Sequence, residues 1–279
     1  MLLDKLRKEY HKELSNTILK VDAGGIPSNS DKYSEISVTL ARNIISQIGE
    51  TGNIPRQSGQ TSGKVFETIT KKYLEKAFQL LVHLRPGKWE FELGKRIEEF
   101  EQYEHLSHLA KALEKNKELH AALGDYIINP DIVVGKRPVD DKEINKKGTI
   151  LKKNDVSSKL TPIRLTNSKI VLLHASISCK WTIRSDRSQN ARTEGLNLIR
   201  NRKGKTPHIA IVTAEPYPQR IASLALGTGD IDCVYHFALP EMQKAALKLN
   251  NEAVLETLAL MVNGKRLRDI SDLPFDLTS

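Results

Sequence analysis

Cysteine is scarce in this sequence, and long hydrophobic runs are absent. Two cysteines, Cys179 and Cys233, are too few for a disulfide framework or a cysteine-rich zinc site. Both lie in apolar, strand-like segments, so we expect buried free thiols. No apolar run approaches the roughly 20 residues that a membrane-spanning helix needs. The opening segment, MLLDKLRKEYHKEL, predicts an amphipathic helix rather than a secretory signal. We therefore expect a cytoplasmic protein that does not enter a membrane.

The sequence also has no internal repeat and no low-complexity stretch. Its 279 residues suit one large domain or two small ones. The formal net charge of +9 favours a polyanionic partner, because each Lys or Arg placed near a phosphate releases condensed counterions. Many basic proteins never bind nucleic acid, so the net charge favours a polyanionic partner but does not identify one.

The first part of the chain has mainly helical patterns. We expect helices over residues 2–20, 36–49 and 62–84, a short strand at 89–93, and a long charged helix over about 96–122. Ser62 is an N-cap candidate for the third helix, and the run Arg85-Pro86-Gly87 is a strong stop signal for it.

Strands alternate with helices in the second part. The expected strands are 126–136, 169–183, 208–214 and 233–239, and the expected helices are about 188–201, a short one after Pro218, and about 240–262. Residues 137–168 lack periodicity and predict a long surface excursion. The alternation predicts an α/β fold. Since no flexible linker separates the parts, we expect one domain over 1–279, with the helical part (about 1–122) packed on an α/β core (about 123–262).

Three charged residues stand in segments that are otherwise apolar or core-facing. Asp131 follows Pro130 in a run of β-branched residues, and Lys180 ends the most apolar strand. Glu194 lies in the following helix, whose apolar positions Ala191, Leu198 and Ile199 should face the core. A buried charge costs free energy unless it is paired or bound to a metal.

An Asp, a Glu and a Lys near strand ends suit magnesium-dependent phosphodiester hydrolysis. Carboxylates hold hard divalent cations through oxygen, and the metal activates water and neutralises charge on the phosphate. The lysine offsets developing negative charge. Each residue taken alone is also compatible with a surface salt bridge or a strand-end charge.

The spacing of these residues resembles a known signature. Lys180 follows Pro130-Asp131 by 49 positions and Glu194 follows by 14 more, which is similar to the rearranged PD-(D/E)xK motif of type II restriction endonucleases for CCGG-type sites. Ser178 stands where the common form has an acidic residue, and Glu194 supplies the missing carboxylate. The chain most resembles the NgoMIV branch, whose target is GCCGGC. Similar segments are GQTSGKVFE (59–67), LGDYIINPDIVV (123–134), LLHASISCKWTIRSDRSQNARTEGLNLIRNRKGKTPHIAIVTAEP (172–216), ALGTGDIDCVYHFAL (225–239) and MVNGKRLRDISDLPFDL (261–277).

This resemblance implies roles for particular residues. Asp131 and Glu194 would bind metal, Lys180 would be the catalytic lysine, and Ser178 belongs to the same motif. Glu67 matches a further acidic residue of the family's active site, although it is equally compatible with a solvated helix carboxylate. The implied cofactor is Mg²⁺, two ions per active site.

The segment Arg184-Ser185-Asp186-Arg187 has the chemistry to read C·G pairs. Arg bonds guanine O6 and N7 in the major groove, and Asp accepts from cytosine N4. Arg187 and Glu194 are about two helical turns apart and share a face, so one helix would both read bases and position a metal. The alternative is an exposed helix start with local ion pairs.

The resemblance assigns the outer base pair to Asp31 and Arg220, which are otherwise ordinary loop polar residues. Tyr33 departs from the family pattern, which has a small polar residue there. The basic run at 200–205 suits phosphate contacts or a solvated turn. We expect His174 and His236 to be core histidines.

The resemblance also implies fold and assembly. We expect the restriction-endonuclease fold, a central mixed sheet flanked by helices. A palindromic site requires a two-fold symmetric reader, so a dimer is the minimum, and the family implies a homotetramer. The products would be 5′-phosphates with 5′ overhangs. Two alternatives stay open: a repair or recombination nuclease with little sequence preference, and a non-catalytic DNA-binding module.

Overall fold

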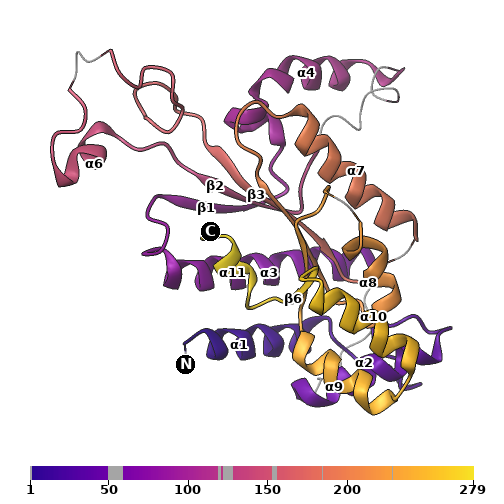
Figure 1. Ribbon diagram of the computed structural model, residues 1–279. Helices are drawn as coiled ribbons and strands as arrows, with labels where there is room; N and C mark the ends of the chain where they lie inside the picture. The colour runs from indigo at the N-terminus through magenta and orange to yellow at the C-terminus, as the bar shows by residue number, and fades with distance from the viewer. Residues whose placement is uncertain are drawn as a thin grey trace.

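A six-stranded sheet forms the centre of the molecule (Figure 1). The computed structural model describes residues 2–49, 59–118, 121, 128–152, 156–183, 185–227 and 229–279, with the backbone alone at 185–189. The strands, in spatial order, are β1 Trp89–Leu93, β2 Ile132–Lys136, β3 Leu172–Lys180, β4 His208–Thr213, β5 Cys233–His236 and β6 Leu267–Asp269. β1, β2 and β3 pair antiparallel, whereas β3 to β6 pair parallel. The expected α/β fold with a central mixed sheet is confirmed.

Helices flank this sheet on both faces. The α-helices are α1 Leu2–Thr17, α2 Glu35–Ile48, α3 Gly59–Leu81, α4 Ser107–Lys115, α6 Asp141–Ile144, α7 Ser185–Asn201, α8 Pro218–Ala225, α9 Leu239–Leu249, α10 Glu252–Asn263 and α11 Leu273–Asp276. Figure 1 shows α3 and α7 on opposite sides of the strands. Of the helices in the described ranges, none is long and apolar enough to cross a membrane.

The alternation of side chains along the strands creates two apolar layers. Ile132 and Val134 of β2 belong to the larger core cluster, to which α1, α2 and α3 contribute. Val133 points to the opposite face and joins a smaller cluster with Tyr103 and with Leu198 of α7. The large cluster therefore joins the helical first part of the chain to the sheet, and the small one seats α7 on the other face.

Several buried residues confirm the sequence-based predictions. Cys179 and Cys233 are free and buried. His174 Nε2 lies 2.7 Å from the carbonyl oxygen of Leu277, and His236 Nε2 lies 3.2 Å from that of Glu215. Ala191 and Leu198 are buried on the inner face of α7, as expected.

The long helix expected over 96–122 was wrong within the described residues. Two 3-10 helices, Ile97–Glu99 and Glu101–Leu106, precede the nine-residue α4. Phe100 has an extended backbone between them, and Gln102 forms two hydrogen bonds with the main chain of Leu173. Packing of the aromatic residues and this pairing with the start of β3 override the helical propensity of the charged sequence.

Other expected boundaries also need correction. Ser62 is buried inside α3 rather than capping it, because the helix already begins at Gly59. β2 begins only at Ile132, so Asp131 precedes the strand, and β5 ends at His236 rather than at 239. The helix expected over 240–262 is two helices, because Asn250 adopts a left-handed backbone with φ 53° and Asn251 caps α10 through its side chain. β6 and α11 were not predicted.

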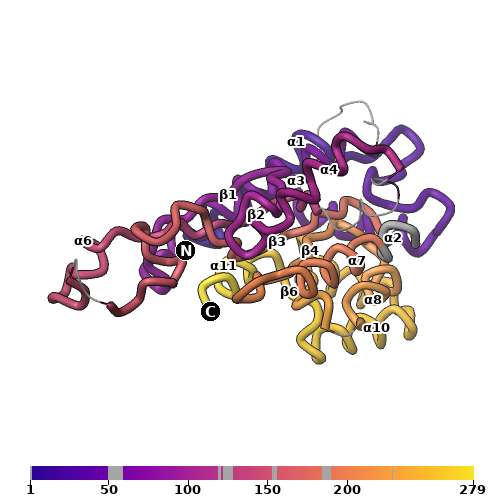
Figure 2. The backbone as a smooth tube through the Cα atoms, turned by 90° about the horizontal axis from the view of Figure 1, so that it is seen from above, coloured from indigo at the N-terminus to yellow at the C-terminus, as the bar shows by residue number. Residues whose placement is uncertain are grey.

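The described residues 137–152 and 156–168 form the expected surface excursion. In both views the segment that carries α6 projects from the body of the molecule (Figures 1 and 2). Its two sides are joined by a bridge between Val139 and Arg164, and the buried Arg164 guanidinium binds both carboxylate oxygens of Asp141 at 2.7 Å. The described tip exposes Val156 and Leu160 almost fully.

We predict that the ion pairs of Arg7 strengthen the attachment of α1, beyond the apolar packing of that helix. Its guanidinium forms hydrogen bonds with Asp269 at 2.9 and 2.8 Å and with Glu241 at 2.9 and 2.6 Å. Arg7→Ala would leave the buried Asp269 without its ion-pair partner, so urea unfolding should show a loss of about 3–5 kcal/mol. The exposed pair between Lys8 and Asp4 is the control, since Lys8→Ala should leave the stability almost unchanged. Equal losses would contradict this account.

Candidate active site

The candidate site lies where β2 begins and β3 ends. Because these strands are antiparallel, with Ile132 paired to Ile177, the residue before β2 lies beside the last residues of β3. Asp131 Oδ2 accepts hydrogen bonds from Cys179 N at 2.7 Å and Ser178 Oγ at 3.3 Å. It also lies 3.5 Å from Lys180 Nζ. The structure therefore brings Asp131, Ser178 and Lys180 together.

Side-chain alternation along β3 explains this arrangement. Ser178 and Lys180 point to one face of the sheet, whereas Cys179 points to the core and offers only its backbone N–H to the site. The side chains of Lys180 and Asp131 stay 18% and 25% exposed, so both remain accessible to a substrate.

Glu67 approaches the same place from α3. Its neighbour Phe66 packs edge-on against Trp181, the residue after Lys180, with 5.3 Å between ring centroids. Burial raises the pKa of Glu67 to about 7; the negative charge of Asp131 adds to the rise, and the positive charges of Lys180 and Lys64 oppose it.

Glu194 approaches from α7. Burial raises its pKa, the charge of Lys180 lowers it, and the charge of Asp131 raises it further. The next residue, Gly195, lets α7 press on the loop before β5, because a Cβ there would collide with the carbonyl oxygen of Asp230. This close approach fixes the helix turn that carries Glu194.

These carboxylates have the chemistry of a hard-cation site. All three offer oxygen, and two have raised pKa values because burial and a neighbouring negative charge disfavour their ionised forms. Within the described part of the chain, no group of three or more such side chains is gathered closely enough to bind a metal by itself. Mutual repulsion of carboxylates opposes such gathering, and a cation would relieve it. The donor set therefore fits Mg²⁺.

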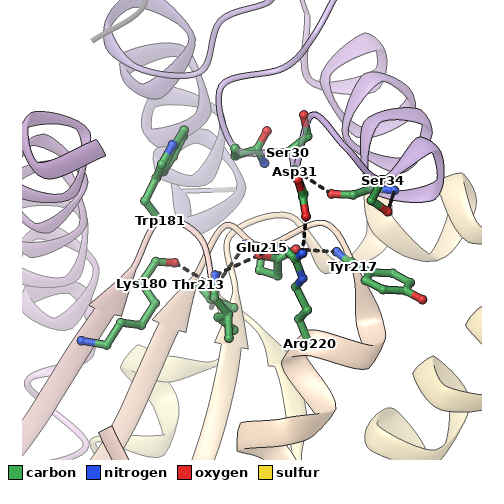
Figure 3. Close-up of polar contacts among 12 residues, drawn as sticks. Ser30, Asp31, Ser34, Lys180, Trp181, Thr213, Glu215, Tyr217 and Arg220 are labelled. Atoms are coloured by element: carbon green, nitrogen blue, oxygen red, sulfur yellow. Dashed lines mark hydrogen bonds and ion pairs between the residues drawn. The ribbon is translucent and has the colours of Figure 1, made fainter. Parts of the chain in front are cut away.

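A second polar cluster lies beyond the ends of β3 and β4 (Figure 3). Asp31 and Arg220, which are 189 positions apart, form a direct ion pair there. Glu215, which sequence reasoning missed, is fully buried beneath them. The only sequence signal for Glu215 is its position, as an acidic residue directly after an apolar strand. Tyr33 is 86% exposed beside this cluster, with Lys32 Nζ 4.7 Å from its ring centroid.

The predicted base-reading segment is only partly described. Arg184 lies outside the described residues, and Asp186 and Arg187 lie in the first turn of α7, where only the backbone is described. Their side chains therefore stay predictions. Ile183, the last described residue before α7, is held at the second cluster, since Ile183 N donates to Glu215 Oε2 at 2.9 Å.

Comparison with known proteins gives consistent matches. Residues 10–279 match the model of the NgoMIV restriction enzyme family. The chain is 50% identical to the type II restriction enzyme NgoMIV of Neisseria gonorrhoeae, over 99% of this chain and 98% of that protein.

Two solved structures are also similar along most of their length. One is the restriction endonuclease PspGI in complex with substrate DNA, with 14% identity, a TM-score of 0.30, and coverage of 99% of this chain and 91% of that one. The other is the type IIF restriction endonuclease Bse634I with cognate DNA, with 12% identity, a TM-score of 0.33, and coverage of 98% and 92%.

We predict that the charge of Asp131 adds to the effect of burial in raising the pKa of Glu67. Asp131→Asn should lower the pKa of Glu67 from about 7 toward its ordinary value, whereas Lys180→Met should raise it further. NMR titration of the glutamate side-chain carboxyl carbons measures both shifts. Asp272→Asn, at the start of α11, is the control: Asp272 is not among the charges that act on Glu67, so its loss should leave the pKa of Glu67 unchanged. A Glu67 titration that Asp131→Asn does not move would show that the two groups are not neighbours.

Proposed function

We propose, from the premise that this chain belongs to the NgoMIV restriction enzyme family and is a type II restriction endonuclease, that it cuts both strands of double-stranded DNA at GCCGGC with magnesium. The observation that carries the chemistry is the contact of Asp131 with Ser178, the Cys179 amide and Lys180, with Glu67 and Glu194 beside it.

Asp131 and Glu194 would hold Mg²⁺, with Glu67 as a further acidic group. When bound, the cation supplies an activated water and neutralises charge on the phosphate. Cys179 N and Ser178 Oγ keep the Asp131 carboxylate at the mouth of the site. Lys180 Nζ, 3.5 Å from that carboxylate, is positioned to offset negative charge on the scissile phosphate. Water oxygen bonds to phosphorus, the bond to the 3′ oxygen breaks, and that oxygen leaves as a hydroxyl, which gives a 5′-phosphate end.

The residues that we propose to contact bases have the chemistry to recognise a GC-rich site. Arg184, Asp186 and Arg187, around the start of α7, would read the CCGG core, and Arg220 with Asp31 would read the outer G·C pair. The contact between Arg220 and Asp31 supports this pairing of roles, because one base pair needs both a donor and an acceptor in reach. α7 carries Glu194 together with Asp186 and Arg187, which would couple reading to cutting.

A palindromic site also needs two copies of the reader. We propose a dimer as the minimum assembly and a homotetramer of two dimers as the complete one, cutting with 5′ overhangs. The whole chain, 1–279, would act as a single endonuclease domain in the cytoplasm.

The cleavage prediction uses plasmid DNA with one GCCGGC. We expect a single linear product with magnesium and none with chelator. Lys180→Ala should slow cleavage by about 10²–10³-fold, as loss of an electrostatic contact to the transition state does elsewhere, while the exposed Lys248→Ala leaves the rate unchanged. Random degradation would indicate the unspecific nuclease instead, and tight binding without cleavage would indicate the binding module.

The readout prediction concerns the outer base pair. Arg220→Lys keeps the positive charge but loses the planar guanidinium group, which can form two parallel hydrogen bonds. The preference of this variant for GCCGGC over ACCGGT should therefore fall by about 1–3 kcal/mol in binding free energy. Arg268→Lys is the matched control, because Arg268 also pairs with a carboxylate, that of Asp276 at 2.6 Å, but is not a predicted reader. An unchanged preference in Arg220→Lys would remove Arg220 from the base-reading surface.

A further inference from the structure

Glu215 is a fully buried carboxylate with no role in the reaction described above. It follows Ala214 directly after β4, and its side chain is inaccessible to solvent. It therefore cannot contact DNA itself. Burying a carboxylate costs free energy unless hydrogen bonds compensate for the lost water, so its partners indicate what this residue does.

Those partners come from two separate segments. Glu215 Oε2 accepts from Ile183 N at 2.9 Å, and Oε1 accepts from Tyr217 N at 3.2 Å. Arg220 Nη1 lies 3.9 Å from Oε2. One side chain thus joins the backbone that leads into α7 to the first turn of α8.

Arg220 extends this link to a third segment. Its other nitrogen, Nη2, bonds Asp31 (Figure 3). The loop that carries Asp31 is fastened to the same strand ends, because Asn29 Nδ2 donates to Ala214 O at 2.7 Å and Trp181 Nε1 donates to Ser28 O at 3.4 Å.

The network also reaches the catalytic strand. Thr213 Oγ1 donates to Lys180 O at 2.8 Å and accepts from Glu215 N at 3.1 Å. A short chain of hydrogen bonds thus connects the main chain of Lys180 with Glu215 and, through Glu215, with Arg220.

We propose that Glu215 is a positioning residue for sequence readout: its buried carboxylate fixes Arg220 and the backbone entering α7 relative to each other, so that the outer and inner base pairs are read in one register. This inference deepens the proposed function and rests on it.

The charge of Glu215 is set by its surroundings. Burial raises its pKa to about 7, against the hydrogen bonds from Ile183 and Tyr217 and the charge of Arg220, while the charge of Asp31 adds to the rise. From β5, His236 faces the main-chain oxygen of Glu215; its pKa is lowered to about 4, so it stays neutral near pH 7. A proton on Glu215 removes one of the two carboxylate charges beside Arg220, the other being that of Asp31.

The test measures binding to two duplexes, GCCGGC and ACCGGT, from about pH 6 to about pH 8.5. Calcium replaces magnesium, so that no DNA is cut. The wild type should prefer GCCGGC, and this preference should fall as the pH drops through about 7. Glu215→Gln should reduce the preference about tenfold at pH 8.5 and make it independent of pH.

Glu241→Gln is the matched control, because Glu241 is a partly buried carboxylate bonded to Arg7 and not to any reader. It should keep both the preference and its pH dependence. A wild-type preference that is flat across this range, or a Glu215→Gln protein that behaves like the wild type, overturns the positioning role. If the wild type itself does not prefer GCCGGC, the proposed function fails first, so the two failures are distinguishable.

Discussion

The structure depends on one hydrogen bond, which Cys179 N donates to Asp131 Oδ2 at 2.7 Å. It joins the start of β2 to the end of β3, where the antiparallel half of the sheet meets its parallel half. At that junction the main chain of β3 supplies a donor, Ser178 a hydroxyl and Lys180 a cation to the same carboxylate oxygen. The sheet topology thus builds the centre of the site before any helix contributes.

The helices α3 and α7, one on each face of the sheet, then add the carboxylates of Glu67 and Glu194, whose burial costs free energy. Glu67 and Glu194 have raised pKa values because burial and Asp131 both disfavour their ionised forms. Their positions are held by packing away from the site, through Phe66 on Trp181 and through Gly195 against Asp230. A site that brings three carboxylates toward one lysine carries an excess of negative charge, which suits a divalent cation and a phosphate together.

Sequence patterns were most informative where apolar periodicity was strong, as in β1, β3, β4 and α2. They failed where tertiary contacts decide the backbone. Phe100 and Gln102 break the helix expected over 96–122, and the left-handed Asn250 divides the last long one. The site residues were found through spacing and resemblance, since no periodicity relates Asp31 to Arg220. Glu215 was missed because a buried acidic residue after a strand resembles an ordinary loop carboxylate until its partners are known.

The account's central claim is that Asp131, Glu194 and Lys180 serve one cation-dependent centre. The most direct measurement is Mn²⁺ binding, followed by electron paramagnetic resonance, in the full chain with a GCCGGC duplex. We predict that the wild type binds Mn²⁺, that Glu194→Gln and Asp131→Asn each lose this binding, and that Lys180→Met keeps it, because the lysine is not a ligand. Equal Mn²⁺ binding in the wild type and in both carboxylate variants would contradict the claim.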